Sequence, residues 1–145
     1  MKKKIQKDTM SEMAHELIEH VSSQKNSKAT ILALSGDLGA GKTTLAKEIA
    51  RALGVVEHVS SPTFVIMKIY PLDTEICKFK KLIHIDAYRL QSSKELFQLG
   101  LEDICADKNN IIIVEWPEYV PECVPDDALW VKLSHIDEHS REISY

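Results

Sequence analysis

The residues best suited to chemistry lie in one short stretch, GDLGAGKT at residues 36–43. It matches the phosphate-binding loop pattern G-x-x-x-x-G-K-[ST] at every fixed position. In such a loop, consecutive backbone N–H groups surround an anion, and the N-terminus of the following helix adds positive potential. Lys42 would reach the β- and γ-phosphates of a nucleotide, and the Thr43 hydroxyl would bind Mg²⁺. The stretch therefore predicts a nucleotide site.

The sequence around this loop has the order of elements that the motif requires. Residues 30–34 form an apolar run of strand length. Apolar residues then recur at helical spacing between Leu45 and Leu53, and Gly54 suits a helix stop. A strand, a loop and a helix would thus hold the backbone against the phosphates. The expected nucleotide contacts are Asp37, Leu38, Gly39, Ala40, Gly41, Lys42, Thr43 and Thr44.

Two acidic residues at the ends of expected strands could complete the site. Residues 111–114 are four consecutive β-favouring aliphatics, which suit a strand buried on both faces of a parallel sheet. Glu115 follows at the place of a Walker B carboxylate and could hold Mg²⁺ directly or through water. Asp86 could bind a metal-held water or accept a proton. The alternative for Asp86 is a surface strand end with a hydrogen bond to His84.

Thr63 and Trp116 each have two possible interpretations. Pro62 biases the tetrapeptide SPTF at 61–64 away from helix. That segment is either a simple loop or a segment near the γ-phosphate in which Thr63 responds to the nucleotide state. Trp116 either packs against the fold or covers the site.

The remaining pattern predicts an α/β fold of the P-loop NTPase type. We expect a three-layer sandwich whose mixed, mostly parallel sheet carries antiparallel hairpins at its edge. No linker or repeat divides the chain, so residues 1–145 are expected to form a single P-loop domain. Further helices are predicted over 9–21, 93–99 and 101–106, and strand pairs over 64–70 with 76–86 and 128–136 with 141–145.

Composition excludes several classes of protein. The formal net charge is −4 and the chain holds three arginines, which argues against a broad nucleic-acid surface. No apolar run approaches the length of a membrane span, and the lysines at 2–4 are not followed by an apolar signal segment. Three cysteines without a C-x-x-C pair indicate reduced thiols. We therefore expect a cytoplasmic protein with no membrane contact.

Four motifs in order give the chain a specific resemblance: GDLGAGKT, SPTF at 61–64, HIDAYR at 84–89 and VEWPE at 114–118. With these motifs at this spacing, the chain resembles the TsaE (YjeE) family of bacterial P-loop ATPases, which serve tRNA threonylcarbamoyladenosine synthesis. The likeness covers nearly the whole length. It implies ATP and Mg²⁺ as cofactors. It assigns catalysis to Asp86, Glu115, Lys42 and Thr63, metal binding to Thr43 and Glu115, and nucleotide contacts to the loop, Trp116, Ser11 and Arg141.

The resemblance also implies partners. TsaB and TsaD of the family carry out threonylcarbamoyl transfer to the adenosine next to the anticodon, and ATP turnover by TsaE would drive or reset that complex. Contact with tRNA would then be indirect.

Two other functions stay open. A small-molecule kinase would clamp the transferring phosphoryl group with several cationic groups, and three arginines and the lack of a lid insertion argue against it. A nucleotide-binding scaffold without turnover is opposed by Glu115 and Asp86 together. A GTPase is disfavoured because no N-K-x-D sequence is present.

Overall fold

The structure is a computed structural model, and it describes residues 1–56, 59 and 65–145. The SPTF segment, with Thr63 and its expected response to the nucleotide, lies outside the described residues.

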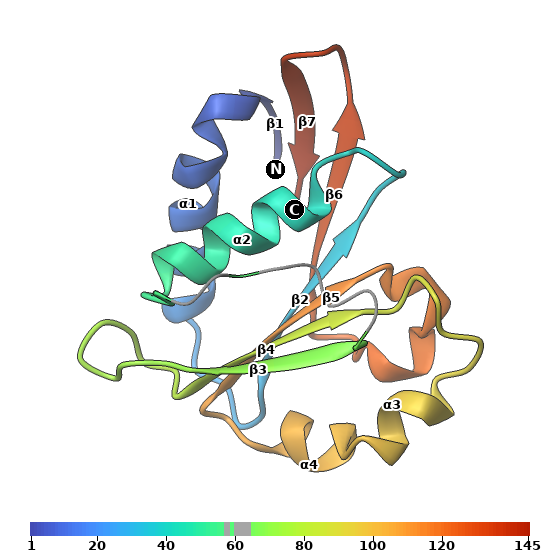
Figure 1. Cartoon of the computed structure of the whole chain (residues 1–145). Coiled ribbons are helices and arrows are strands. Elements are labelled where there is room, and N and C mark those ends of the chain that lie inside the picture. Colours follow the sequence, from blue (N-terminus) through green and yellow to red (C-terminus); the bar gives the residue numbers. More distant parts are fainter. Residues whose placement is uncertain (57–58, 60–64) are drawn as a thin grey trace.

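A sheet of seven strands in the described residues runs through the molecule in the order β1-β7-β6-β2-β5-β4-β3 (Figure 1). Strands β6, β2, β5 and β4 are mutually parallel and form its centre. The edges are antiparallel: β3 pairs with β4 on one side, and β7 pairs with β6 and β1 on the other. The strands are β1 (Lys2–Gln6), β2 (Thr30–Ser35), β3 (Met67–Pro71), β4 (Lys81–Asp86), β5 (Asn110–Glu115), β6 (Leu129–His135) and β7 (Ser140–Ser144).

Helices cover both faces of this sheet. α1 (Met10–Ser22) and α2 (Lys42–Ala52) pack on one face, and the short α3 (Lys94–Gln98) and α4 (Leu101–Ala106) lie on the other (Figure 1). Single turns of 3₁₀-helix are η1 (Lys7–Thr9), η2 (Pro117–Tyr119) and η3 (Pro121–Cys123). The expected three-layer α/β fold with a mixed sheet is confirmed.

The central strands explain why two cores form. Because side chains alternate along a strand, Leu32 and Leu34 of β2 pack towards α1 and α2, while Ile31 packs towards α4. In β5, Ile113 and Val114 divide between the two cores in the same way. The unbroken aliphatic run at 111–114 is therefore a strand buried on both faces, as predicted.

Most expected elements are confirmed, with shifted ends. The strand predicted over 64–70 runs from Met67 in the described residues, and Ile66 before it has a positive φ of 66°, which is not extended backbone. The return strand begins at Lys81, because a turn in which the Cys77 amide donates to the Asp73 carbonyl occupies the residues before it.

Strand β1 was not predicted at all. Its Lys-rich sequence carries little apolar signal, yet it pairs in antiparallel register with β7, from Lys2 opposite Ser144 to Gln6 opposite Ser140. Lysines on an edge strand discourage pairing with other chains. Here they also form ion pairs, between Lys2 and Glu142 and between Lys3 and Glu16.

Candidate functional site

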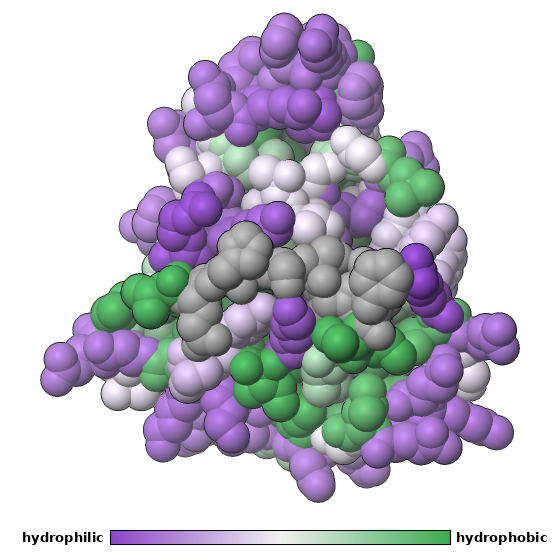
Figure 2. All heavy atoms as spheres, in the orientation of Figure 1, coloured by the Kyte–Doolittle hydropathy of each residue, from purple (hydrophilic) through white to green (hydrophobic). Residues whose placement is uncertain are grey.

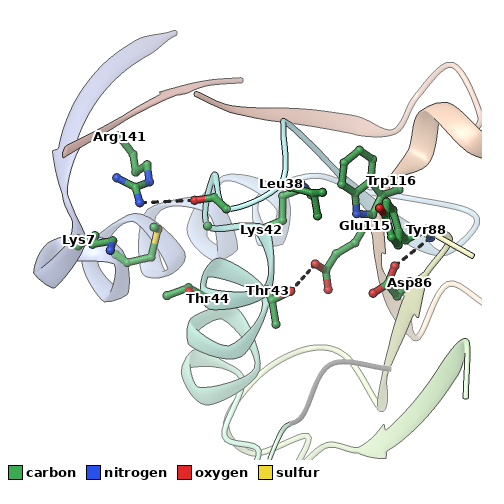
Figure 3. A pocket seen from close by; sticks show the side chains of 13 residues that line it. Lys7, Leu38, Lys42, Thr43, Thr44, Asp86, Tyr88, Glu115, Trp116 and Arg141 are labelled. Carbon is green, nitrogen blue, oxygen red and sulfur yellow. Dashed lines mark hydrogen bonds between the residues drawn. The ribbon is translucent and has the colours of Figure 1, made fainter. Parts of the chain in front are cut away.

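Three chemically important segments meet at the carboxyl edge of the central strands. The glycine-rich loop follows β2, Glu115 ends β5 and Asp86 ends β4. The register pairs Glu115 with Leu34 on one side and with Asp86 on the other. Ligands of open α/β sheets bind beyond this edge. A cavity of about 590 Å³ lies there, and both acidic residues line it together with the loop (Figure 3).

The loop needs glycine for two different reasons. Gly36 has a φ of 144°, and a Cβ added to it would lie 2.3 Å from the backbone oxygen of Leu133 on β6. No side chain fits between the two segments. Gly41 has a φ of 106° and is the N-cap residue immediately before α2. The backbone conformation there is costly for other residues, so glycine allows the loop to enter the helix directly.

Lys42 points back into its own loop. Its Nζ donates to the carbonyl oxygens of Gly36 at 2.5 Å and Asp37 at 2.9 Å, and lies 4.0 Å from the centre of the Trp116 ring. Burial lowers the pKa of Lys42, and the nearby carboxylate of Glu115 is the largest of the influences that oppose this shift. The ammonium is thus a desolvated charge at the cavity wall, where it would bind an anion strongly.

Glu115 is held at both carboxylate oxygens. Its Oε1 accepts a hydrogen bond from the Thr43 hydroxyl at 2.7 Å, and its Oε2 lies 2.6 Å from His84 Nε2. His84 and Glu115 are both almost completely buried, with side chains 1% and 2% exposed. Because an ionised carboxylate only accepts, the imidazole must donate from Nε2. His84 therefore bonds to Glu115, so the alternative of a surface His84–Asp86 hydrogen bond is wrong.

Asp86 is buried as well, although it lines the cavity. Its Oδ1 accepts a hydrogen bond from the backbone amide of Tyr88 at 3.0 Å. Its own amide donates to the Ile66 carbonyl, which ties the end of β4 to the start of β3. The carboxylate is therefore oriented at the same edge as Glu115 (Figure 3).

Trp116 packs against neighbouring rings, as one of its two interpretations predicted, and it also lines the cavity. Its ring lies 5.0 Å from that of Tyr88 and 5.3 Å from that of Tyr119, centre to centre. Its backbone has a φ of 59°, an uncommon value for a residue other than glycine. This turn directs the indole towards Lys42 immediately after the strand end.

The other end of the cavity is formed by residues far apart in sequence. Figure 3 shows Lys7 and Arg141 on the side of the loop opposite to Asp86 and Trp116. Arg141 is buried, and its Nε donates to the Ala40 carbonyl at 3.1 Å. It also donates to the carbonyls of Asp137 and Ser140. Arg141 therefore braces the loop from the terminal hairpin.

The structure divides the expected nucleotide contacts into two groups. Leu38, Gly39, Gly41, Lys42, Thr43, Thr44, Trp116 and Arg141 line the cavity. Asp37, Ala40 and Ser11 do not, and the Ser11 side chain is exposed on α1. Lys7 and Met10 occupy that side of the cavity instead. Sequence reasoning missed both as site residues, because only the fold brings η1 and the start of α1 beside the loop.

The donors in this cavity suit Mg²⁺ with a nucleotide. A magnesium ion is usually bound through one or two carboxylates together with phosphates and water. Thr43 and Glu115 provide a hydroxyl and a carboxylate 2.7 Å apart beside the loop. In the described residues, no group of three or more His, Cys, Asp or Glu side chains could hold a metal alone.

Two expectations from composition concern other parts of the chain. Cys77, Cys105 and Cys123 are free thiols, as predicted. No helix within residues 1–56, 59 and 65–145 is long and apolar enough to cross a membrane.

The fold and the site define an α/β protein of the P-loop class. A glycine-rich loop joins a parallel strand to a helix, and carboxylates end the two neighbouring strands. The family model described as threonylcarbamoyl adenosine biosynthesis protein TsaE matches residues 5–143. The chain belongs to the TsaE family.

Curated relatives and a solved structure agree with this assignment. The tRNA threonylcarbamoyladenosine biosynthesis protein TsaE of Bacillus subtilis is 36% identical over 79% of this chain and 68% of its own length. The protein of the same name from Treponema pallidum is 31% identical, with coverage of 81% and 82%. The crystal structure of Bacillus subtilis YdiB superposes with a TM-score of 0.68 at 27% identity, covering 99% of this chain and 84% of that one.

Proposed function

We propose that this protein is an ATPase that binds ATP with Mg²⁺, hydrolyses it slowly, and drives or resets a TsaB–TsaD complex during threonylcarbamoyladenosine modification of tRNA. Membership of the TsaE family supports a role in threonylcarbamoyladenosine synthesis. The observation that carries the activity is the arrangement of Lys42, Thr43, Glu115 and Asp86 around one cavity. Each of these side chains has a distinct role in phosphoryl transfer to water.

The protein's own groups would divide the work as follows. The loop amides and the Lys42 ammonium would bind the phosphates, and Thr43 with Glu115 would hold Mg²⁺. When bound, the metal would supply positive charge next to the phosphate oxygens, where charge develops as water attacks. Asp86 or Glu115 would orient the water, since both carboxylates are buried at the same strand edge. Trp116 and Tyr88 would limit access of bulk water from that side.

We expect slow turnover by the isolated chain because its arginines have other bonding partners or lie away from the cavity. Arg141 already donates to backbone carbonyls of the loop and hairpin, and Arg51 is paired with Glu48 on the surface of α2. Arg141 is the one arginine that lines the cavity among the described residues. A partner that supplied a cation or reshaped the site would accelerate hydrolysis. We place the protein in the cytoplasm with TsaB and TsaD, and contact with tRNA would run through that complex.

ATP hydrolysis by the purified chain, alone and with TsaB–TsaD, tests this proposal. We expect slow turnover that rises when the complex is added. Asp86→Ala should keep nucleotide binding but lose hydrolysis by about 100-fold or more. Asp103→Ala, at an exposed position of α4, is the matched control and should change neither. Absence of hydrolysis in both settings would favour a scaffold, and a phosphorylated small molecule would favour a kinase.

A further inference from the structure

His84 is a buried titratable residue to which the proposed mechanism gives no role. It lies on β4, one of the central parallel strands, and its side chain is 1% exposed. Most buried polar side chains satisfy hydrogen bonds within the fold. The partner of His84, however, is the carboxylate that would hold the metal, Glu115.

We propose that His84 is a positioning residue, which holds Glu115 in the orientation required to bind Mg²⁺ together with Thr43. This inference rests on the proposed function. The imidazole donates to Oε2, so that Oε1 remains directed at the Thr43 hydroxyl. Hydrogen bonds from outside the metal shell commonly orient a metal-binding carboxylate in this way.

The backbone explains how a strand residue reaches this place. In the parallel register, Asp86 lies opposite Glu115, and His84 lies two residues earlier on the same face of β4. This side of the sheet is directed towards the layer of α1 and α2, because Leu82 of β4 and Ile113 of β5 pack in that core. Thr43 belongs to the first turn of α2. The carboxylate of Glu115 is therefore fixed between a strand and a helix.

Glu115 also lies close enough to the Lys42 ammonium for the two charges to interact. A glutamate side chain has three rotatable bonds, so an unrestrained Glu115 could turn towards Lys42. That turn would remove a metal ligand and neutralise the phosphate-binding cation together. The hydrogen bond from His84 opposes this turn by holding one carboxylate oxygen of Glu115 in place.

The test measures how much Mg²⁺ strengthens binding of ADP, by calorimetry with and without EDTA. His84→Leu removes the donor and keeps the volume roughly, whereas His84→Gln keeps an N–H donor at a similar reach. For His84→Leu we expect unchanged affinity in EDTA and an approximately 10-fold smaller gain from Mg²⁺. His84→Gln should recover most of the gain. His135→Leu, at an exposed position of β6, should match the wild type.

The possible results separate the positioning role from the metal site itself. Equal loss of affinity with and without Mg²⁺ would show a purely structural role for His84 and overturn the inference. The inference would also be overturned if folded His84→Gln behaves like His84→Leu, or if all variants keep the full gain in ADP affinity from Mg²⁺. Should His84→Leu fail to fold, His84→Asn, whose amide is too short to reach Glu115, takes its place. A wild type without any Mg²⁺-dependent gain would refute the proposed metal site.

Discussion

Two cavities of similar size lie at opposite ends of the central strands, and they differ in what surrounds them. One, of about 590 Å³, lies at the carboxyl ends of β2, β5 and β4. The other, of about 560 Å³, lies near the amino ends of β2 and β6 and is lined by residues of α4 and of the segment before β6. Volume alone does not distinguish them.

The difference lies in the buried charge. The carboxyl-edge cavity is lined by Lys42, Asp86, Glu115 and Arg141, all 5% exposed or less. The charged residues around the amino-edge cavity, such as Lys28 and Glu102, are exposed to solvent. Burying a charge is costly unless partners compensate for it, so a fold that buries four of them at one edge concentrates its chemistry there.

Exposed apolar side chains are less informative than these buried charges. Figure 2 shows apolar side chains gathered on the face near β3 and α3. Exposed apolar residues there include Ile69 and Leu99. Some exposed apolar surface is ordinary for a folded protein, whereas buried charges are uncommon.

The largest expected effect comes from removing the buried cation. Lys42→Ala should abolish detectable ATP binding, a loss of about 100-fold or more, because a charge-assisted contact with the phosphates disappears. Lys28→Ala removes a lysine from the amino-edge cavity and should leave binding unchanged. Calorimetric titration with ATP and Mg²⁺ compares the two. Equal effects of the two substitutions would mean that the carboxyl-edge cavity is not the nucleotide site.

Two glycine substitutions, one in the carboxyl-edge loop and one between α3 and α4, should differ in their effect on the free energy of unfolding. Gly36→Ala should lower the free energy of unfolding by about 3 kcal/mol, because the new Cβ meets the Leu133 carbonyl and the backbone conformation is strained. Gly100, between α3 and α4, also has a positive φ, but no atom lies within 4 Å of the position that an added Cβ would occupy. Gly100→Ala should therefore cost only about 1 kcal/mol. Urea denaturation measures both values, and equal costs would contradict the close approach of the loop to β6.

A spectroscopic change should distinguish the two tryptophans. Trp116 contacts Lys42 in the carboxyl-edge cavity, whereas Trp130 lies on β6, 43% exposed. ATP binding would draw the ammonium away from the indole, so the fluorescence of Trp116 should change. The change should persist in Trp130→Phe and vanish in Trp116→Phe. A signal that follows Trp130 instead would show that nucleotide binding acts elsewhere.

These predictions depend on features that the sequence revealed to different degrees. The loop, the buried β5 run and the ends of α2 could be predicted, because motif spacing and hydrophobic periodicity are local signals. Both acidic residues were expected at strand ends, and the register places them side by side. The expected layers and the parallel centre of the sheet followed from the same patterns.

Other features of the site depend on contacts between distant segments, so no local sequence pattern predicts them. Lys7 reaches the cavity only because β1 pairs with β7, and β1 lacks an apolar alternation strong enough to detect. The bond between His84 and Glu115 joins residues 31 positions apart. The shared face of His84 and Asp86 was visible in the sequence, but it suggested the wrong partner. Only the strand order, with β5 beside β4, identifies the correct one.

The smallest expected effect concerns the thiols of the amino-edge cavity. Burial raises the pKa of Cys105 and that of Cys123 above the ordinary value for cysteine. Because the thiolate is the reactive form, a raised pKa keeps both groups protonated and slow to react at neutral pH.

Alkylation by iodoacetamide across pH, in a Cys77→Ser background, measures this shift. The rate should still be rising above about pH 9, where an ordinary cysteine approaches its plateau, and saturating ATP with Mg²⁺ should leave it unchanged. Strong protection by the nucleotide would couple the amino-edge cavity to the carboxyl-edge site. A midpoint well below about pH 8.5, the ordinary value for cysteine, would mean that the amino-edge cavity stabilises negative charge. The contrast in buried charge between the two cavities would then be wrong.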